Sequence, residues 1–169
     1  MLVPVRVQGD ACLIPFRGES FHLVLMDFVL EHLEFPCRCA REIFRVLKPG
    51  GCLVFRTPNR YHYAPFIASM TPHWFHRLVA NRVRGLSGQA EPDVHPTFYR
   101  ANTLRAVRRI FGEAGFMVER VLMVEREPSY LMFARPAFLL GYCYERLVNR
   151  YDSLANFRSN IFGVMRKPK

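Results

Sequence analysis

The sequence contains no apolar run of the roughly 18 residues that a membrane-spanning helix requires. The best candidate, residues 137–144, is short and follows Arg135 and Pro136. The first residues lack the layout of a secretory signal peptide. Only 22% of the residues are charged and half are hydrophobic, which excludes a disordered chain. We therefore expect one globular domain over residues 1–169, located in the cytoplasm.

Lysine and acidic residues are scarce. The chain has 24 basic residues, of which only Lys48, Lys167 and Lys169 are lysine, against 14 acidic ones, so its formal charge is +10. Two interpretations stay open: a surface for acidic partners, including anionic lipid, or a general bias toward arginine. The sequence contains no RNA-recognition motif, so nucleic acid is not favoured as a partner.

The five cysteines predict neither disulfides nor a metal site. Their number is odd and no secretory signal accompanies them. Cys37 and Cys39 are too close for the usual zinc spacing, and His73 and His76 have no third ligand nearby. We expect no metal. Small core positions are predicted for Cys12, Cys52 and Cys143.

Two nearly continuous apolar segments, residues 21–26 and 52–55, are typical of strands buried on both faces. A helix is predicted between them, because apolar residues recur at offsets of three and four. These residues are Ala40, Ile43, Phe44 and Leu47. Pro49, Gly50 and Gly51 should end that helix. Strand, helix, turn and strand in this order indicate a right-handed βαβ unit.

The last third of the chain repeats the alternation. Thr103 can cap a helix that Gly115 ends, and a strand follows over residues 116–124. A second helix over residues 137–149 and a short strand over residues 160–165 complete the pattern. The predicted fold class is α/β.

Residues 60–102 interrupt the alternation with many aromatic residues, histidines and prolines. We predict a helix over residues 72–84 followed by a loop. Such an insertion after a parallel strand is often a lid or a substrate-binding element. Simple packing of Trp74 and Phe75 over the sheet is the alternative. His95 and Tyr99, at the end of the loop, are favoured as functional residues.

An ordered series of short motifs spans residues 9–59. The series begins with Gly9-Asp10-Ala11 and Ile14-Pro15-Phe16, continues with Ser20-Phe21 and Val29-Leu30-Glu31-His32-Leu33, and ends with Arg45-Val46-Leu47-Lys48-Pro49-Gly50-Gly51 and Thr57-Pro58-Asn59. In this order and spacing the segment resembles the class I methyltransferases that use S-adenosylmethionine, and most closely the type 11 family of small-molecule methyltransferases.

The resemblance implies a Rossmann-like sheet of seven strands, mostly parallel, whose antiparallel last strand lies between the fifth and sixth. The predicted strands would be the fourth to the seventh, and residues 3–7 would be the third. The first two strands are missing, and so is the Gly-rich loop with which the family holds its cofactor, because no GxGxG occurs in this chain. We therefore expect a truncated methyltransferase domain.

The resemblance also assigns candidate residues. Asp10 would accept a hydrogen bond from the adenine amino group and Ala11 would offer its backbone N–H, although an Asx turn is the structural alternative for Asp10. Asp27, at a strand end, would contact the cofactor or orient a nucleophile. His32 would face the site or pack on its helix. The catalytic candidates are His95 and Tyr99, which would hang over the carboxyl ends of the strands.

Two functions remain open. The first is methyl transfer from S-adenosylmethionine to a small-molecule acceptor, such as a quinone, saccharide or lipid precursor near a membrane, with peripheral membrane contact. The second is non-enzymatic: an inactive methyltransferase-like fragment, or a subunit that acts through a partner chain completing its sheet. Whether this chain alone is an enzyme stays undecided at this point, since the Gly-rich loop is absent.

Overall fold

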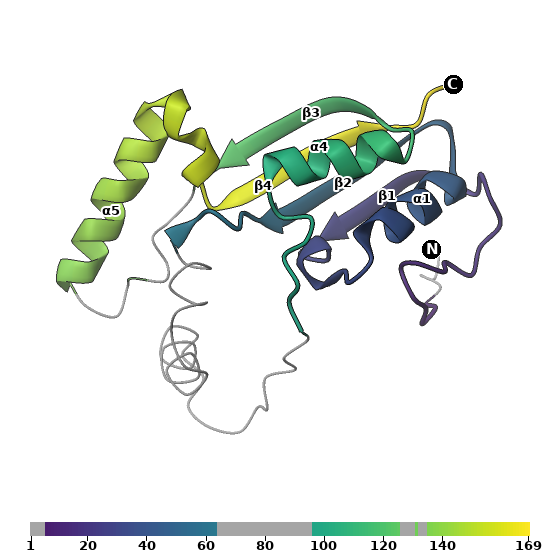
Figure 1. Ribbon diagram of the computed structural model, residues 1–169, viewed down its shortest axis with the longest axis horizontal. Coiled ribbons are helices and arrows are strands. Elements are labelled where there is room, and N and C mark those ends of the chain that lie inside the picture. The colour runs from purple at the N-terminus through teal and green to yellow at the C-terminus, as the bar shows by residue number, and fades with distance from the viewer. Residues whose placement is uncertain (1–5, 64–95, 126–130, 132–134) are drawn as a thin grey trace, which may run out of the picture.

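The computed structural model describes residues 6–63, 96–125, 131 and 135–169 (Figure 1). Strands and helices alternate along the described chain. The elements, in chain order, are β1 (Phe21–Asp27), η1 (Leu30–His32), α1 (Pro36–Val46), β2 (Leu47–Pro58), α4 (Leu104–Glu113), β3 (Met117–Val124), α5 (Arg135–Arg150), η3 (Asp152–Phe157) and β4 (Asn160–Arg166).

The four strands form one sheet in the order β1-β2-β4-β3. β1 and β2 are parallel, with Leu23 opposite Cys52 and Asp27 opposite Arg56. β4 runs antiparallel to both of its neighbours, β2 and β3. The predicted fold is thereby confirmed: the last strand in sequence is inserted, antiparallel, between two strands that precede it.

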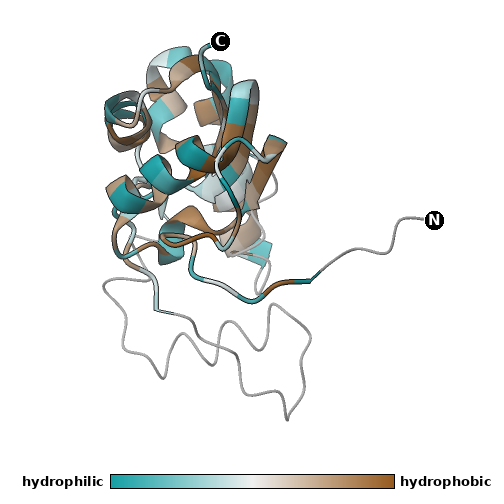
Figure 2. Cartoon of the chain, turned by 90° about the vertical axis from the view of Figure 1, so that its right-hand side faces the viewer, coloured by the Kyte–Doolittle hydropathy of each residue, from teal (hydrophilic) through white to brown (hydrophobic). Residues whose placement is uncertain are grey.

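Helices α1 and α4 cover one face of this sheet (Figure 1). Each helix buries residues three or four positions apart, and the helix ribbons in Figure 2 accordingly carry both hydrophilic and hydrophobic stretches. Thr103 caps α4 by accepting a hydrogen bond from the Ala106 amide at 3.1 Å, worth about 1 kcal/mol. The core between helices and sheet includes Met26, Cys39, Ala40, Ile43, Leu53, Phe55, Val107, Ile110, Phe111, Ile161 and Met165.

The core requires a glycine in β4. Gly163 lies opposite Phe55 in the β2–β4 ladder, and the Phe55 ring stacks on Phe111 with 5.5 Å between centroids. A Cβ atom on Gly163 would lie 2.3 Å from two carbons of the Phe55 ring. The absent side chain therefore makes room for the stacked rings of Phe55 and Phe111 in the core.

The opposite face of the sheet is less covered. Leu23 and Leu25 of β1 are 55% and 69% exposed, and Leu122 of β3 is 50% exposed. Within the part of the chain that the structure describes, β1 pairs with β2 alone, so its second edge carries unpaired backbone groups.

Two boundaries differ from the sequence-based prediction. α1 ends at Val46, before Pro49-Gly50-Gly51, and β2 already begins at Leu47. The reason is tertiary pairing: Leu47 lies opposite Phe21, and the Gly51 carbonyl accepts a hydrogen bond from the Lys167 amide at 2.9 Å. Gly50 adopts the positive φ of 75° that this turn within the strand requires.

The prediction of a strand over residues 3–7 is wrong for the two of these residues that the structure describes. Residues 3–5 lie outside the described residues, and Arg6 and Val7 belong to no strand. The chain that follows is held against α1 instead of the sheet edge. The expected helix over residues 72–84 also lies outside the described residues.

The prediction that the cysteines form no disulfide is also wrong. Cys12 and Cys39 are joined by a disulfide across 27 positions of sequence. Packing of the loop after Asp10 onto α1 brings the two sulfur atoms together, which cysteine counting cannot anticipate. Cys143, expected in the core, is a free and exposed cysteine, and Cys52 is half-buried.

None of the helices in the described ranges is long and apolar enough to cross a membrane.

Candidate functional site

The carboxyl ends of β1 and β2 meet at one edge of the sheet, because the two strands are parallel. Asp27 and Arg56 are neighbours there, and their side chains form a two-pronged ion pair with N–O distances of 2.6 and 2.7 Å. The hydrogen bond from Arg56 holds the pKa of Asp27 below its ordinary value. The Arg56 guanidinium also lies over the Phe28 ring, 4.2 Å from its centroid.

A buried polar network lies beside this ion pair. The Thr57 hydroxyl donates to the Glu31 carboxylate at 3.0 Å, and the Asn102 amide donates to the Thr57 oxygen at 2.6 Å. Asn102 donates to the Pro58 carbonyl as well, at 2.9 Å. Burial raises the pKa of Glu31, against the lowering effect of its hydrogen bonds. The network thus joins η1, the end of β2 and the segment before α4.

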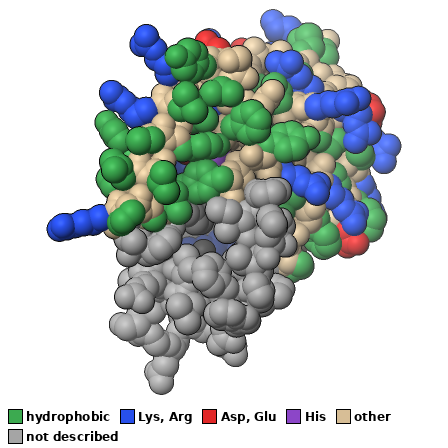
Figure 3. Space-filling view, turned by 60° about the vertical axis from the view of Figure 1, so that its left-hand side comes forward, with side chains coloured by type: hydrophobic (Ala, Val, Ile, Leu, Met, Phe, Trp, Pro, Cys, Tyr) green, Lys and Arg blue, Asp and Glu red, His purple; other side chains and the backbone are tan. Residues whose placement is uncertain are grey.

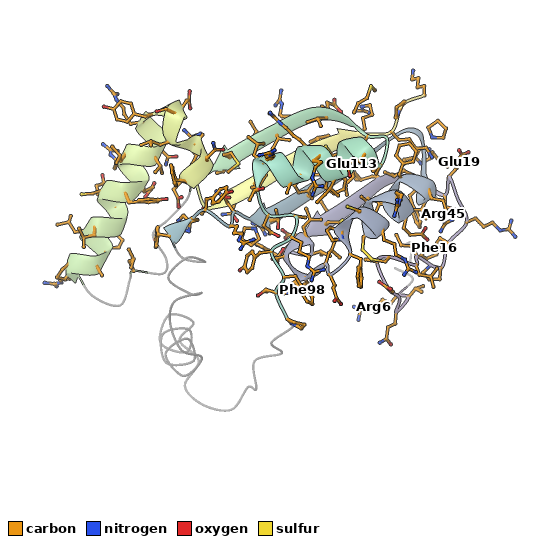
Figure 4. The ribbon with its side chains drawn as sticks, viewed as in Figure 1. Arg6, Phe16, Glu19, Arg45, Phe98 and Glu113 are labelled. Carbon is orange, nitrogen blue, oxygen red and sulfur yellow. A yellow bond between two sulfur atoms is a disulfide. The ribbon has the colours of Figure 1, made fainter. Side chains whose placement is uncertain are left out.

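That segment, residues 96–102, is held onto η1 by backbone contacts. The Glu31 carbonyl accepts hydrogen bonds from the amides of Phe98 and Tyr99 at 2.8 and 3.2 Å. His32 Nδ1 lies 3.0 Å from the Pro96 carbonyl. Tyr99 has a positive φ of 50°, which is uncommon for a tyrosine. Figure 4 shows Phe98 below the sheet, where this segment approaches the end of β1.

A separate loop carries Asp10. The Asp10 carboxylate accepts a hydrogen bond from the Cys12 amide at 2.8 Å, so the Asx turn is present. Arg45 of α1 donates to the carbonyls of Ile14 and Phe16 at 3.1 and 2.9 Å, and Figure 4 shows Arg45 and Phe16 close together. Together with the disulfide, these contacts fasten the loop to α1.

The sequence-predicted site residues therefore fall into two groups. Asp27, His32 and Tyr99 are brought together around η1, at the carboxyl ends of the parallel strands. Asp10 and Ala11 lie on the loop beside α1. The structure shows where both groups lie, and the roles predicted for their residues stay predictions. His95 lies outside the described residues.

Sequence reasoning missed three members of this site. Glu31 lies inside the Leu-Glu-His-Leu motif, and its position between the two leucines of that motif could have indicated a buried carboxylate. Arg56 and Asn102 gave no such signal, since their roles arise only when the strand ends and the segment before α4 come together.

A second buried polar pair follows the ends of β2 and β3. His62 Nε2 lies 3.4 Å from a carboxylate oxygen of Glu125, and both side chains are less than 5% exposed. Tyr144 of α5 packs edge-on against the His62 ring. Burial, followed by the nearby Glu125 and Tyr63, raises the pKa of Tyr144 to about 12. Through Tyr144, α5 therefore packs against the segment that follows β2.

One pocket, of ≈ 340 Å³, opens at the start of α4. None of the sequence-predicted site residues lines it. Its walls are formed by Tyr61, Thr103, Leu104, Arg105, Arg108 and Asn156. Among the described residues, no group of three or more histidine, cysteine or acidic side chains could hold a metal ion.

Comparison with known proteins connects this geometry to a family. Residues 2–55 match the family model described as a methyltransferase domain. The chain is 35% identical to a demethylmenaquinone methyltransferase of Renibacterium salmoninarum over 78 residues, which cover 45% of this chain and 33% of that protein. A protein of the same name from Lactiplantibacillus plantarum is 30% identical over 116 residues, covering 64% and 46%. The chain thus spans about a third to a half of the length of these relatives.

Solved structures agree on the fold. An S-adenosylmethionine-dependent methyltransferase from Thermotoga maritima superimposes with a TM-score of 0.56 over 95% of this chain and 63% of that one. The sequence identity is 16%, so this likeness concerns the fold alone. In its matched motifs over residues 2–55 and in its named relatives, the chain is similar to the type 11 S-adenosylmethionine-dependent methyltransferases, and its sheet has the fold of such an enzyme.

Proposed function

We propose that this protein takes part in methyl transfer from S-adenosylmethionine to a small, quinone-like or lipid-like acceptor in the cytoplasm. The observation that carries the proposal is the polar cluster around Asp27 and Glu31, at the carboxyl ends of β1 and β2. Open α/β sheets bind their ligands at this edge. Two relatives named demethylmenaquinone methyltransferase support a quinone as the acceptor, and a saccharide precursor is the alternative within the same class.

The described residues fit the adenine end of the cofactor. Asp10 is exposed, and a carboxylate offers about four lone-pair sites, of which the Cys12 amide uses one. Asp10 can therefore still accept a hydrogen bond from an adenine amino group, with the Ala11 backbone beside the ring. For the ribose and methionine ends, the described residues hold no Gly-rich loop.

The residues around η1 would serve the acceptor side. When bound, S-adenosylmethionine supplies a methyl group activated by its positive sulfur, so alignment of the acceptor is the protein's main task. Asp27, fixed by Arg56, presents a carboxylate in a set direction. His32 belongs to η1 and Tyr99 to the segment bound to η1, and His95 directly precedes that segment in the sequence. We assign residues 60–102 the role of a substrate-covering insertion, since the described end of this segment is bound to η1.

An alternative function is that of a subunit without activity of its own. The second edge of β1 and its exposed Leu23 and Leu25 favour this alternative, since a strand and helices from a partner chain would complete the sheet there.

Calorimetry of S-adenosylmethionine binding to the 169-residue chain separates the two functions. Asp10→Ala should weaken binding about tenfold, which corresponds to about 1.4 kcal/mol. Asp10→Asn is the matched control for the Asx turn, because an amide oxygen can still accept from the Cys12 amide. If both variants bind like the unmodified chain, Asp10 does not contact the adenine. If a folded sample does not bind at all, this chain alone is not the enzyme and the subunit function is favoured.

A further inference from the structure

Helix α5 projects from the sheet and is attached to the described structure mainly through its C-terminal half (Figure 1). The Tyr144 hydroxyl donates to the Phe157 carbonyl, and Arg158 donates to the Val148 carbonyl at 3.0 Å. Of the 16 residues of the helix, only Gly141 and Val148 are buried. Most of its circumference therefore faces outward.

The outward surface of α5 is apolar to an unusual degree. Leu139, Leu140 and Leu147 are 61%, 71% and 51% exposed, and Phe138 and Tyr142 are more than 40% exposed. A leucine left in water forgoes about 1.5–3 kcal/mol relative to full burial. Figure 3 shows hydrophobic side chains gathered on this side of the molecule. A contiguous group of this kind marks a surface that meets another apolar phase.

Arginines are interleaved with these apolar residues. Arg135 lies four residues before Leu139, and Arg146 and Arg150 lie seven and eleven residues after it. At these helical spacings the three arginines share the outward stripe of Leu139, and all three are exposed. The only acidic residue of α5, Glu145, lies half-buried on the inner flank. In Figure 3, basic side chains project at the margin of the hydrophobic group.

This combination selects among the surfaces that could cover the helix. A second copy would bring three arginines against three arginines, which repel each other. An anionic bilayer accepts both components: leucine and aromatic side chains enter the acyl boundary while arginines extend to the phosphates. The charge of +10 favours approach to such a surface.

We propose that α5 is an interfacial helix that docks this protein onto anionic phospholipid. The helix lies in the plane of the headgroups, with Leu139, Leu140 and Leu147 inserted and Arg146 and Arg150 on the lipid phosphates. This docking goes beyond the proposed methyl transfer and needs neither cofactor nor acceptor.

Sedimentation with vesicles tests the proposal. The chain should bind phosphatidylcholine vesicles that contain about a quarter phosphatidylglycerol, and bind pure phosphatidylcholine at least tenfold more weakly. Arg146→Gln with Arg150→Gln should weaken binding to the anionic vesicles tenfold or more. Leu140→Ser with Leu147→Ser should do the same by removing inserted apolar surface. Circular dichroism and thermal melting establish that each variant is folded.

Arg105→Gln with Arg108→Gln is the matched control, since it removes the same charge from the exposed face of another helix, α4. Its affinity for the vesicles should fall less than twofold. An equal loss in this control would overturn the proposal, because net charge alone would then explain binding. Unchanged binding of the leucine variant, or no vesicle binding by the folded chain, would overturn it too. So would a dimer that the leucine variant abolishes, since a second copy would then cover α5. A failure of methyl transfer leaves each of these readouts unaffected.

Discussion

The Thr57 hydroxyl donates a hydrogen bond to the Glu31 carboxylate at 3.0 Å, in a site where both residues are buried. This contact joins the end of β2 to the 3₁₀ turn that follows β1, across 26 positions of sequence. The side-chain amide of Asn102 donates a hydrogen bond to the same Thr57 oxygen, and this contact ties the segment before α4 to the other two. Three chain segments are therefore fixed at the sheet edge by one short chain of hydrogen bonds.

The buried Glu31 should make stability depend on pH. Its pKa is raised above the ordinary 4.5 chiefly by burial, so the folded chain holds this proton more tightly than the unfolded chain. This contribution is fully present below pH 4.5 and is lost as the pH rises through the raised value. The Glu31→Gln variant has no carboxylate to ionise there, so its stability should not fall in this way. The free energy of unfolding of Glu31→Gln minus that of the unmodified chain should therefore rise between pH 4.5 and pH 8. Urea unfolding at several pH values measures it.

Glu34→Gln, three residues further along and exposed, is the control for that series. Its free energy of unfolding should follow that of the unmodified chain at every pH. A constant difference between Glu31→Gln and the unmodified chain over this range would contradict a raised pKa for Glu31.

Asn102→Ala should destabilise the fold. The side-chain amide is fully buried and donates to both Thr57 and the Pro58 carbonyl, so its removal leaves two buried acceptors with fewer partners. We expect a loss of about 2–3 kcal/mol in the free energy of unfolding. Asn149→Ala, on the exposed side of α5, should stay within about 0.5 kcal/mol of the unmodified chain. Equal effects of the two substitutions would argue against the network.

Two glycine-to-alanine substitutions should have opposite signs. In Gly163→Ala the new methyl would lie 2.3 Å from the Phe55 ring, so we expect a loss of about 2–4 kcal/mol or an unfolded chain. In Gly112→Ala the new methyl would have no atom within 4 Å. Because residue 112 lies in α4, the higher helix propensity of alanine should stabilise the folded chain by about 0.5–1 kcal/mol. Thermal melting of both variants checks the prediction, and a stable Gly163→Ala would show that Phe55 has another rotamer available.

Reduction should loosen the loop that carries Asp10. The Cys12–Cys39 disulfide closes 27 positions of chain, for which loop entropy predicts about 3–4 kcal/mol of stabilisation. A reducing agent should lower the melting temperature of the unmodified chain. Cys12→Ser should melt at that lower temperature with or without the reducing agent. Cys37→Ser, a free cysteine on the same helix, should keep the full response. Alkylation of five thiols in the unreduced folded chain would refute the disulfide.

Much of the fold could be predicted from local pattern. The apolar runs at residues 21–26 and 52–55 became the parallel strands β1 and β2, but the expected burial on both faces is wrong for β1, where Leu23 and Leu25 are exposed. The cap at Thr103 and the stop at Gly115 were also confirmed, since each depends on a backbone geometry set within one helical turn. Asp27 at a strand end followed from the same periodicity.

The rest depended on contacts between distant segments. The start of β2 at Leu47 is set by pairing with Phe21, which overrides the Pro-Gly-Gly signal. The disulfide, the ion pair of Asp27 with Arg56 and the network around Glu31 each join residues more than 20 positions apart. By itself, the sequence determined the resemblance to the methyltransferases, the strand order that this resemblance implies and the residue types at the sheet edge, because these are encoded in local pattern and motif order. Only the tertiary structure decided which of those side chains meet, since hydrogen bonds and ion pairs act over a few ångströms and the chain must first be folded to bring them within that range.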